Sequence, residues 1–394
     1  MLKQKWFWWG ILCFVFFIPV SQYLSTRLLF LLFLASFFVE KNRFRVGLLG
    51  ASWDLFGYLL VLLFGLIYTT DTKMGWRVME TNFSFLALPF IFFRNPLSTK
   101  KELHSILLAF IVGILFSCSI CFFYAVWLYA LNHNFSSFFH EDFTAVIGFQ
   151  PTYLAYYICF SVTALLYFLY YEKLHMSLYV YAIVLVLLFA GLILTGGRTG
   201  YVSMLFVFSF FVLKFLFEEE RTVVKKMTFF ISVLFLVAML VISHFNFNSA
   251  STPAEGYYWE RLSLWKSAID ANSDFLLGVG TGDYKEVMNK YYVTHNLSQF
   301  APDSFNAHNQ FLQTDFSNGL IGLVAILLLI GRPLYLSVKY QNVLGILVFF
   351  SFIIYGMMEV FLGRYQGVVF FVFLHQVFIQ FYFSRRSSFS LKEI

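Results

Sequence analysis

The chain of 394 residues is 60% hydrophobic and 12% charged, and it contains 55 Phe. Soluble proteins carry about 25% charged residues, so the composition excludes a soluble domain and indicates a polytopic membrane protein. The formal net charge is +6. Because Lys and Arg are needed to orient membrane segments, this charge does not indicate a nucleic-acid partner.

Apolar segments follow one another along almost the whole chain. A membrane-spanning helix needs about 20 apolar residues, and the segments lie near residues 6–20, 27–39, 46–68, 83–93, 104–130, 152–171, 178–195, 200–217, 227–245, 308–330, 342–358 and 366–383. The second and fourth are short. A backbone in lipid must pair its polar groups within the protein, which helices achieve. We therefore predict an all-α, polytopic fold with about 12 transmembrane helices.

The distribution of Lys and Arg predicts the orientation of these segments. With the N-terminus in the cytoplasm, 18 of the 27 Lys and Arg residues fall inside and 9 outside. This bias predicts that both termini are cytoplasmic. Residues 1–245 then hold transmembrane helices 1–9, and residues 246–307 form a large outer loop with short amphipathic helices. Residues 308–394 hold helices 10–12 and a cytoplasmic tail.

The cysteines give no sign of a metal site or a disulfide. All four lie inside predicted membrane segments, at Cys13, Cys118, Cys121 and Cys159. Cysteines in such surroundings behave as small apolar side chains. We therefore predict buried thiols, and neither a disulfide nor a bound metal ion.

The first candidate site residue lies in the tight turn from Thr195 to Gly200, between the seventh and eighth segments. Glycines such as Gly197 allow a backbone to approach a ligand closely, and the helix that follows presents its N-terminal amides outward. Arg198 in this setting suits a phosphate group. The alternative is that Arg198 only extends its charge to the membrane surface.

The outer loop contains a second candidate, Arg261. Residues 255–271 read as a helix whose apolar stripe is Tyr258, Trp259, Leu262, Trp265 and Ile269. This helix is expected to lie on the membrane or to cover the bundle. Arg261 is then either held over the mouth of the bundle or solvated.

The glycine-rich run 278–282 lacks the preceding strand and the Lys-Ser/Thr pair of a phosphate loop, so we predict a turn that leads into a short helix near residues 283–292.

His308 stands at the outer start of the tenth segment, among the amides Asn306, Asn309 and Gln310. Histidine exchanges protons near neutral pH, and side-chain amides can bind sugar hydroxyls. The alternative is a structural histidine with satisfied hydrogen bonds. The other histidines expected on the outer side do not lie among amides at the start of a segment: His133, His140, His244 and His295.

Three further charged residues have open roles. Glu359 and Arg364 flank the turn between the last two segments, on the outer side, where they can assist the site. We expect them to pair with each other. Asp54 lies within an apolar segment, nearer the inside. Such a charge indicates either a functional site or a contact in helix packing or assembly.

Two arginines and a histidine on one membrane face suit a lipid diphosphate donor. Their motifs resemble those of the O-antigen ligase family over roughly residues 190–330. The matching runs, in order, are Gly196 to Gly200, Arg261 to Trp265, Gly278 to Gly282, His308 to Leu312 and Asn318 to Gly322. Their order and spacing are more specific than any one of them alone.

The resemblance implies a GT-C-like fold with a large periplasmic loop between helices 9 and 10. It implies a metal-independent, inverting glycosyltransferase of the bacterial inner membrane that needs no cofactor. Arg198 and Arg261 would bind the diphosphate of an undecaprenyl-diphosphate-linked glycan, and His308 would take the acceptor proton. Possible supporting residues are Gly197, Asn309, Gln310, Glu359 and Arg364.

The acceptor implied for a ligase is the lipid A-core oligosaccharide. O-antigen polymerases and protein O-oligosaccharyltransferases resemble the ligases over the same motifs, so both remain alternatives. A lipid-glycan transporter or flippase is a different class. Transporters place charges near the membrane midplane, often in repeated halves. This sequence shows no convincing repeat and gathers its candidate charges on one face, which favours an enzyme.

Overall fold

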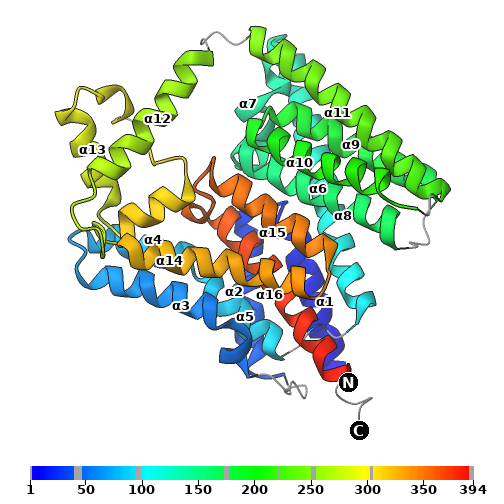
Figure 1. The fold of residues 1–394 in the computed structure, drawn as a ribbon, viewed down its shortest axis with the longest axis horizontal. Helices are drawn as coiled ribbons and strands as arrows, with labels where there is room; N and C mark the ends of the chain where they lie inside the picture. The colour runs from blue at the N-terminus through cyan, green and yellow to red at the C-terminus, as the bar shows by residue number, and fades with distance from the viewer. Residues whose placement is uncertain are drawn as a thin grey trace.

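The computed structural model describes residues 2–39, 47–94, 97, 99–172, 177–219, 222–249, 254–301 and 305–389. Its regular elements in these ranges are helices (Figure 1). The α-helices are α1 (Leu2–Phe17), α2 (Gln22–Ser36), α3 (Leu48–Ile67), α4 (Thr72–Thr81), α5 (Ser84–Arg94), α6 (Lys100–Asn132), α7 (His140–Thr144), α8 (Pro151–Tyr171), α9 (Leu178–Thr195), α10 (Arg198–Leu216), α11 (Val223–Ser249), α12 (Ala254–Asp270), α13 (Tyr284–Thr294), α14 (Gln310–Lys339), α15 (Val343–Gly356) and α16 (Tyr365–Phe389).

The predicted fold class is confirmed: the protein is all-α and polytopic. Seven helices within the described ranges are long and apolar enough to cross a membrane, namely α3, α6, α8, α9, α10, α14 and α16. Shorter apolar helices are α1, α2 and α15. Each predicted segment coincides with a helix, but α5 has only 11 residues. The total of twelve spans therefore stays a prediction.

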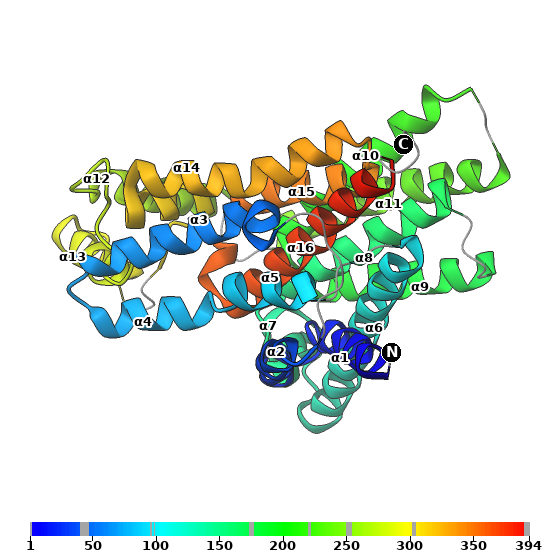
Figure 2. The ribbon, with the colours of Figure 1, turned by 90° about the horizontal axis from the view of Figure 1, so that it is seen from below.

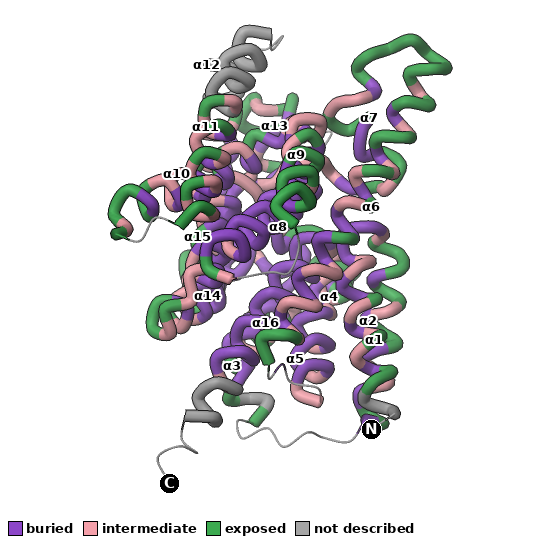
Figure 3. The backbone as a smooth tube through the Cα atoms, turned by 90° about the vertical axis from the view of Figure 1, so that its right-hand side faces the viewer, coloured by how far each residue is buried: buried purple, intermediate pink, exposed green. Residues whose placement is uncertain are grey.

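Two helices form the centre of the bundle. Side chains all around α8 and along the described part of α16 are buried, as expected for helices that are apolar on every face (Figure 3). Seen from below, α16 runs between α14 and the α1–α2 pair (Figure 2). Aromatic rings join the two central helices to their neighbours: Tyr156 of α8 stacks on Tyr355 of α15 at 4.2 Å, and Phe370 of α16 stacks on Phe110 of α6 at 5.1 Å.

Outer helices such as α9 show the complementary pattern. Ile183, Val186 and Leu187 are 59%, 62% and 53% exposed, although all three are apolar. Such a stripe is stable only beside other apolar groups, so it marks the face of α9 that meets lipid. Burial at the centre and apolar exposure at the rim are what a bundle in a bilayer requires.

We call the end of the bundle at which α8, α10 and α14 begin the His308 end, and the opposite end the Asp54 end. At the His308 end, the run 278–282 is a packed turn between α3 and α14, as predicted. Thr281 Oγ1 donates to Leu62 O of α3 at 2.9 Å, and Asn318 Nδ2 of α14 donates to Thr281 Oγ1 at 3.0 Å. α14 is interrupted at Gly319 (φ 61°, ψ −161°). A β-carbon there would collide with the backbone of Leu276, so only glycine fits.

α12 and α13 form a separate layer beside α14, on the left in Figure 1. The predicted helix is present, and part of its apolar stripe is exposed, so its expected location on the membrane or over the bundle stays a prediction. Trp259 and Ile269 are 64% and 58% exposed, whereas Leu264 and Ala268 are buried against α13 and α14. Small Ala268 lets the neighbouring helices approach more closely than a row of aromatic residues would. The side chain of Tyr258 lies outside the described residues.

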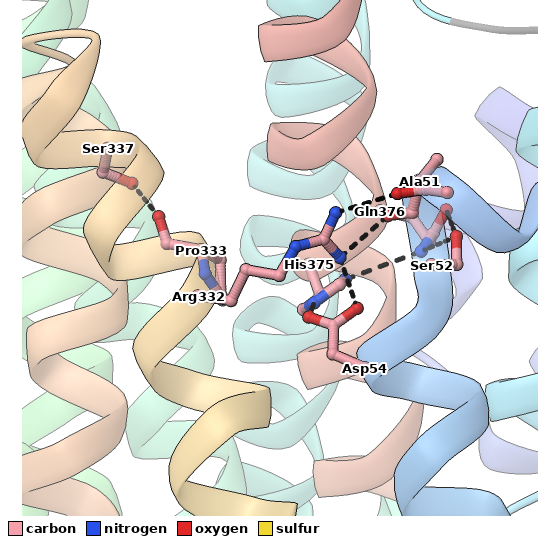
Figure 4. A network of polar contacts seen from close by, with 9 residues as sticks. Ala51, Ser52, Asp54, Arg332, Pro333, Ser337, His375 and Gln376 are labelled. Atoms are coloured by element: carbon pink, nitrogen blue, oxygen red, sulfur yellow. Dashed lines mark hydrogen bonds and ion pairs between the residues drawn. The ribbon is translucent and has the colours of Figure 1, made fainter. Parts of the chain in front are cut away.

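A buried ionic cluster holds three helices together at the Asp54 end (Figure 4). Asp54 of α3 accepts from Arg332 Nη1 of α14 at 2.6 Å and contacts His375 Nε2 of α16 at 2.7 Å. Beside them, Gln376 Nε2 donates to Ser52 Oγ at 3.0 Å. Ser52 leaves the helical conformation (φ −131°, ψ 24°), which kinks α3 at the cluster. Asp54 therefore has the helix-packing contacts that the sequence left as one of two possibilities.

Replacing Asp54 should destabilise the protein strongly. Asp54→Asn keeps the size of the side chain but leaves the Arg332 guanidinium and His375 without their carboxylate. Breaking a buried ion pair from one side costs about 3 to 5 kcal/mol. We expect a lower thermal unfolding midpoint for Asp54→Asn in detergent micelles. Glu80→Gln, at an exposed residue of α4, is the control. Equal midpoints for the two variants would contradict the role of the cluster.

Candidate functional site

His308 stands directly before α14. Its backbone is in the left-handed region (φ 42°), and its N–H donates to Asn306 Oδ1 at 2.9 Å. Asn309 is the N-cap of α14, because its Oδ1 accepts from the backbone N–H groups of Phe311 and Leu312 at 3.0 and 3.1 Å. The unusual backbone angle thus turns the chain from the outer segment into the helix. The imidazole is 28% exposed.

Glu359 is the charged partner of His308. His308 Nδ1 lies 3.5 Å from Glu359 Oε1, and the Glu359 side chain is 12% exposed. Burial alone would raise the pKa of the Glu359 carboxyl. The nearby His308 ring, the N–H of Val360 and the charge of Arg261 together hold this pKa below its usual value. Glu359 is therefore a carboxylate at neutral pH.

The expected pair between Glu359 and Arg364 is wrong. The carboxylate faces His308, which lies before α14, whereas Arg364 is exposed at the start of α16. Arg364 lies near α13: burial raises the pKa of Tyr284 to about 12, and the Arg364 charge opposes that rise. Sequence proximity misled here, because the residues between the two charges form a tight turn that directs them apart.

Arg261 belongs to the same cluster as His308 and Glu359. Its Nη1 donates to the carbonyl oxygen of Met358 at 2.9 Å, one residue before Glu359. The guanidinium is half-buried. α12 thus holds a positive charge over the turn between α15 and α16. The sequence left two expectations for Arg261, a residue held over the bundle or a solvated charge. The contact with Met358 favours the first.

Arg198 is exposed at the first residue of α10, in a turn that α7 and α8 hold. Gly196 has φ 61°, and a β-carbon there would collide with the His140 ring. A β-carbon on Gly197 would lie 2.8 Å from Cβ of Ala155 in α8. These two glycines are therefore fixed by close packing against neighbouring helices.

The first turns of α8 connect the Arg198 turn with the Glu359 turn. Ala155 contacts Gly197 on one side. Two residues earlier, Tyr153 Oη donates to Val360 O at 3.2 Å on the other side. The first turns of α8 thus contact both the turn that carries Arg198 and the turn that carries Glu359. Tyr153 was not singled out in the sequence, since one tyrosine among 24 in a mostly apolar chain carries no signal.

Gln310 fixes the Glu359 turn on α14. Its Oε1 accepts from the N–H of Leu362 at 2.7 Å, and its Nε2 donates to Thr314 Oγ1 at 2.9 Å. The side-chain oxygen of Asn309 is likewise used in capping. These amides hold the protein's own backbone beside His308.

Among the residues that the structure describes, no group of three or more His, Cys, Asp or Glu side chains is arranged to hold a metal ion.

Comparison with known proteins gives two matches. Residues 183–327 match the model of the family described as O-antigen ligase. A stretch of 271 residues is 22% identical to a protein of Haemophilus influenzae named "Uncharacterized protein". It covers 61% of this chain and 66% of that relative. The relative's name assigns no activity.

The family match spans the Arg198 turn, Arg261, the packed turn 278–282 and His308. These are the motifs on which the sequence resemblance was based, so that resemblance is confirmed. Residues 183–327 are therefore similar to the O-antigen ligase family.

Proposed function

We propose that this protein is a glycosyltransferase that moves a glycan from an undecaprenyl-diphosphate-linked donor to an acceptor hydroxyl. The match to the O-antigen ligase family supports a ligase- or polymerase-like activity in a membrane. The observation that carries the proposal is that His308 and Arg261 converge on the Glu359 turn. The first turns of α8 contact both this turn and the turn that carries Arg198.

The proposed reaction needs a general base for the acceptor and positive charge for the leaving diphosphate. His308 takes the proton of the acceptor hydroxyl as the acceptor oxygen attacks the anomeric carbon. The bond between that carbon and the diphosphate oxygen breaks, and its electron pair leaves with undecaprenyl diphosphate. Attack from the side opposite the leaving group inverts the anomeric configuration. Arg198 and Arg261 bind the diphosphate and stabilise its growing charge.

The donor is already activated, because its diphosphate is a good leaving group. The proposed reaction therefore requires neither ATP nor a metal ion. We place it at the periplasmic face of the inner membrane, with both termini cytoplasmic. The excess of Lys and Arg in the loops at the opposite side supports this orientation.

The proposed acceptor is the lipid A-core oligosaccharide, with another lipid-linked glycan or a protein hydroxyl as alternatives. A transporter is less well supported. A carrier needs ionisable groups that engage its cargo near the membrane midplane, whereas Asp54 and His375 are engaged with each other and Arg332.

The acceptor is tested with purified protein and its undecaprenyl-diphosphate-linked glycan. The reactions contain a chelator and no ATP, with and without rough lipopolysaccharide, and are separated on a gel. We expect glycan on the lipopolysaccharide. Longer lipid-linked glycan without added acceptor would identify a polymerase. No product in either reaction would exclude both glycan acceptors and leave a protein acceptor or a transporter, and strict dependence on a metal ion would contradict the proposed mechanism.

His308→Ala should abolish transfer while the protein still folds. General-base catalysis contributes about 100- to 10,000-fold, and we expect kcat to fall by a factor in that range. His295→Ala is the matched control, because His295 is an exposed histidine at the end of α13. The unfolding midpoint of each variant shows whether it is folded. A folded His308→Ala protein with full activity would remove the proposed base.

Arg198→Ala and Arg261→Ala should weaken stabilisation of the leaving diphosphate. Loss of one such group costs about 100- to 1,000-fold in kcat, and Arg261→Lys should keep part of the activity because it keeps the charge. Lys266→Ala, an exposed position on the same helix, is the control for Arg261. Equal kcat in Lys266→Ala and Arg261→Ala would show that Arg261 has no special role.

A further inference from the structure

The two nitrogens of the His308 ring lie in different surroundings. Nδ1 is buried and makes no hydrogen bond in this structure, and the Glu359 carboxylate lies 3.5 Å from it. The side chain as a whole is nevertheless 28% exposed. The accessible part of the ring therefore lies away from Nδ1, and a proton can reach the ring from outside only at the Nε2 side.

Glu359 is held more firmly than a loop carboxylate usually is. Its Oε1 accepts from the N–H of Val360 at 3.1 Å. On one side of it, Arg261 donates to Met358 O. On the other, the N–H of Leu362 donates to Gln310 Oε1. The turn between α15 and α16 is thus attached to both α12 and α14, so the carboxylate has a fixed position relative to His308.

The His308 backbone is equally constrained. The chain before it is fixed because the N–H of Ala307 donates to Gln313 Oε1 at 3.1 Å, and the chain after it is the N-cap of α14. The left-handed angle at His308 is rare for a residue other than glycine. Strained backbone of this kind persists where the surroundings determine it, often at functional sites.

From these contacts we propose that Glu359 is a positioning residue for His308. Its carboxylate accepts a hydrogen bond from Nδ1–H, which leaves Nε2 unprotonated and pointed at the acceptor. A carboxylate can only accept, so it selects this tautomer over the alternative. The distance of 3.5 Å is long for a hydrogen bond, and catalytic hydrogen bonds commonly shorten once the substrates bind.

The ionisation of Glu359 fits this role. Burial opposes ionisation, but its pKa lies below the usual value because His308 faces it from the segment before α14, the N–H of Val360 donates to it and Arg261 faces it from α12. Two buried tyrosines, Tyr153 of α8 and Tyr355 of α15, complete its surroundings. The carboxylate therefore remains charged at neutral and mildly acidic pH. The inference rests on the proposed function, since only a base needs a defined tautomer.

The tautomer is measured by magic-angle-spinning NMR on protein with ¹⁵N-labelled histidine at pH 8, where the signal missing from His308→Gln assigns His308. We expect a protonated Nδ1 and an unprotonated Nε2 in the wild type. In Glu359→Gln we expect a mixture of tautomers. A protonated Nε2 in the wild type, or an unchanged spectrum in Glu359→Gln, would overturn the proposal. This readout does not need activity, so it is separate from any failure of the transfer reaction.

The kinetic test compares Glu359→Gln, Glu359→Asp and Glu286→Gln in the transfer assay. Loss of a residue that orients a functional side chain costs about 10- to 100-fold in activity, so kcat of Glu359→Gln should fall by that factor while KM for the donor changes little. Glu359→Asp keeps the charge and should restore part of kcat. Glu286 is an exposed carboxylate on α13 and serves as the control. Unchanged kcat in folded Glu359→Gln, or equal loss in the Asp variant, would overturn the proposal.

Discussion

The pairing of α3 with α14 is the interaction on which the rest of the structure depends. Lipid surrounds the bundle and supplies little hydrophobic drive for helices to associate, so polar contacts and close packing determine their arrangement. The two helices are joined at both ends, by Asp54 and Arg332 at one and by Thr281 between Leu62 and Asn318 at the other. Because His308 directly precedes α14, this pairing also locates the candidate base.

α8 has a comparable role on the other side of the site. It is buried along its length, and its first turns contact the Arg198 turn through Ala155 and the Glu359 turn through Tyr153. A central helix of this kind can fix the positions of two surface turns relative to each other without contributing a charged group. This arrangement explains how three catalytic candidates from distant parts of the sequence come to surround one helix end.

The sequence indicated candidate site residues, but it did not indicate their contacts. Arg198, Arg261 and His308 were found from their motifs, because glycine turns, amphipathic helices and amide-rich helix starts are local patterns. The pairing of Glu359 was predicted wrongly. Its neighbour Arg364 is close in sequence, but the turn between them directs Glu359 toward His308. On α12 the sequence left two locations open for the apolar stripe, and the exposed Trp259 and Ile269 stand apart from the face that packs on α13 and α14.

The sequence by itself determined the all-helical membrane fold and the positions of the helices, because apolar segments in lipid form helices. It also predicted a turn at residues 278–282 from the run of glycines, but not that this turn packs between α3 and α14. Only the tertiary structure decided that Asp54 joins α3, α14 and α16, that Glu359 faces His308, and that Gln310 supports the turn between α15 and α16. These contacts join residues between about 50 and 320 positions apart, and their formation depends on three-dimensional packing that no local pattern records.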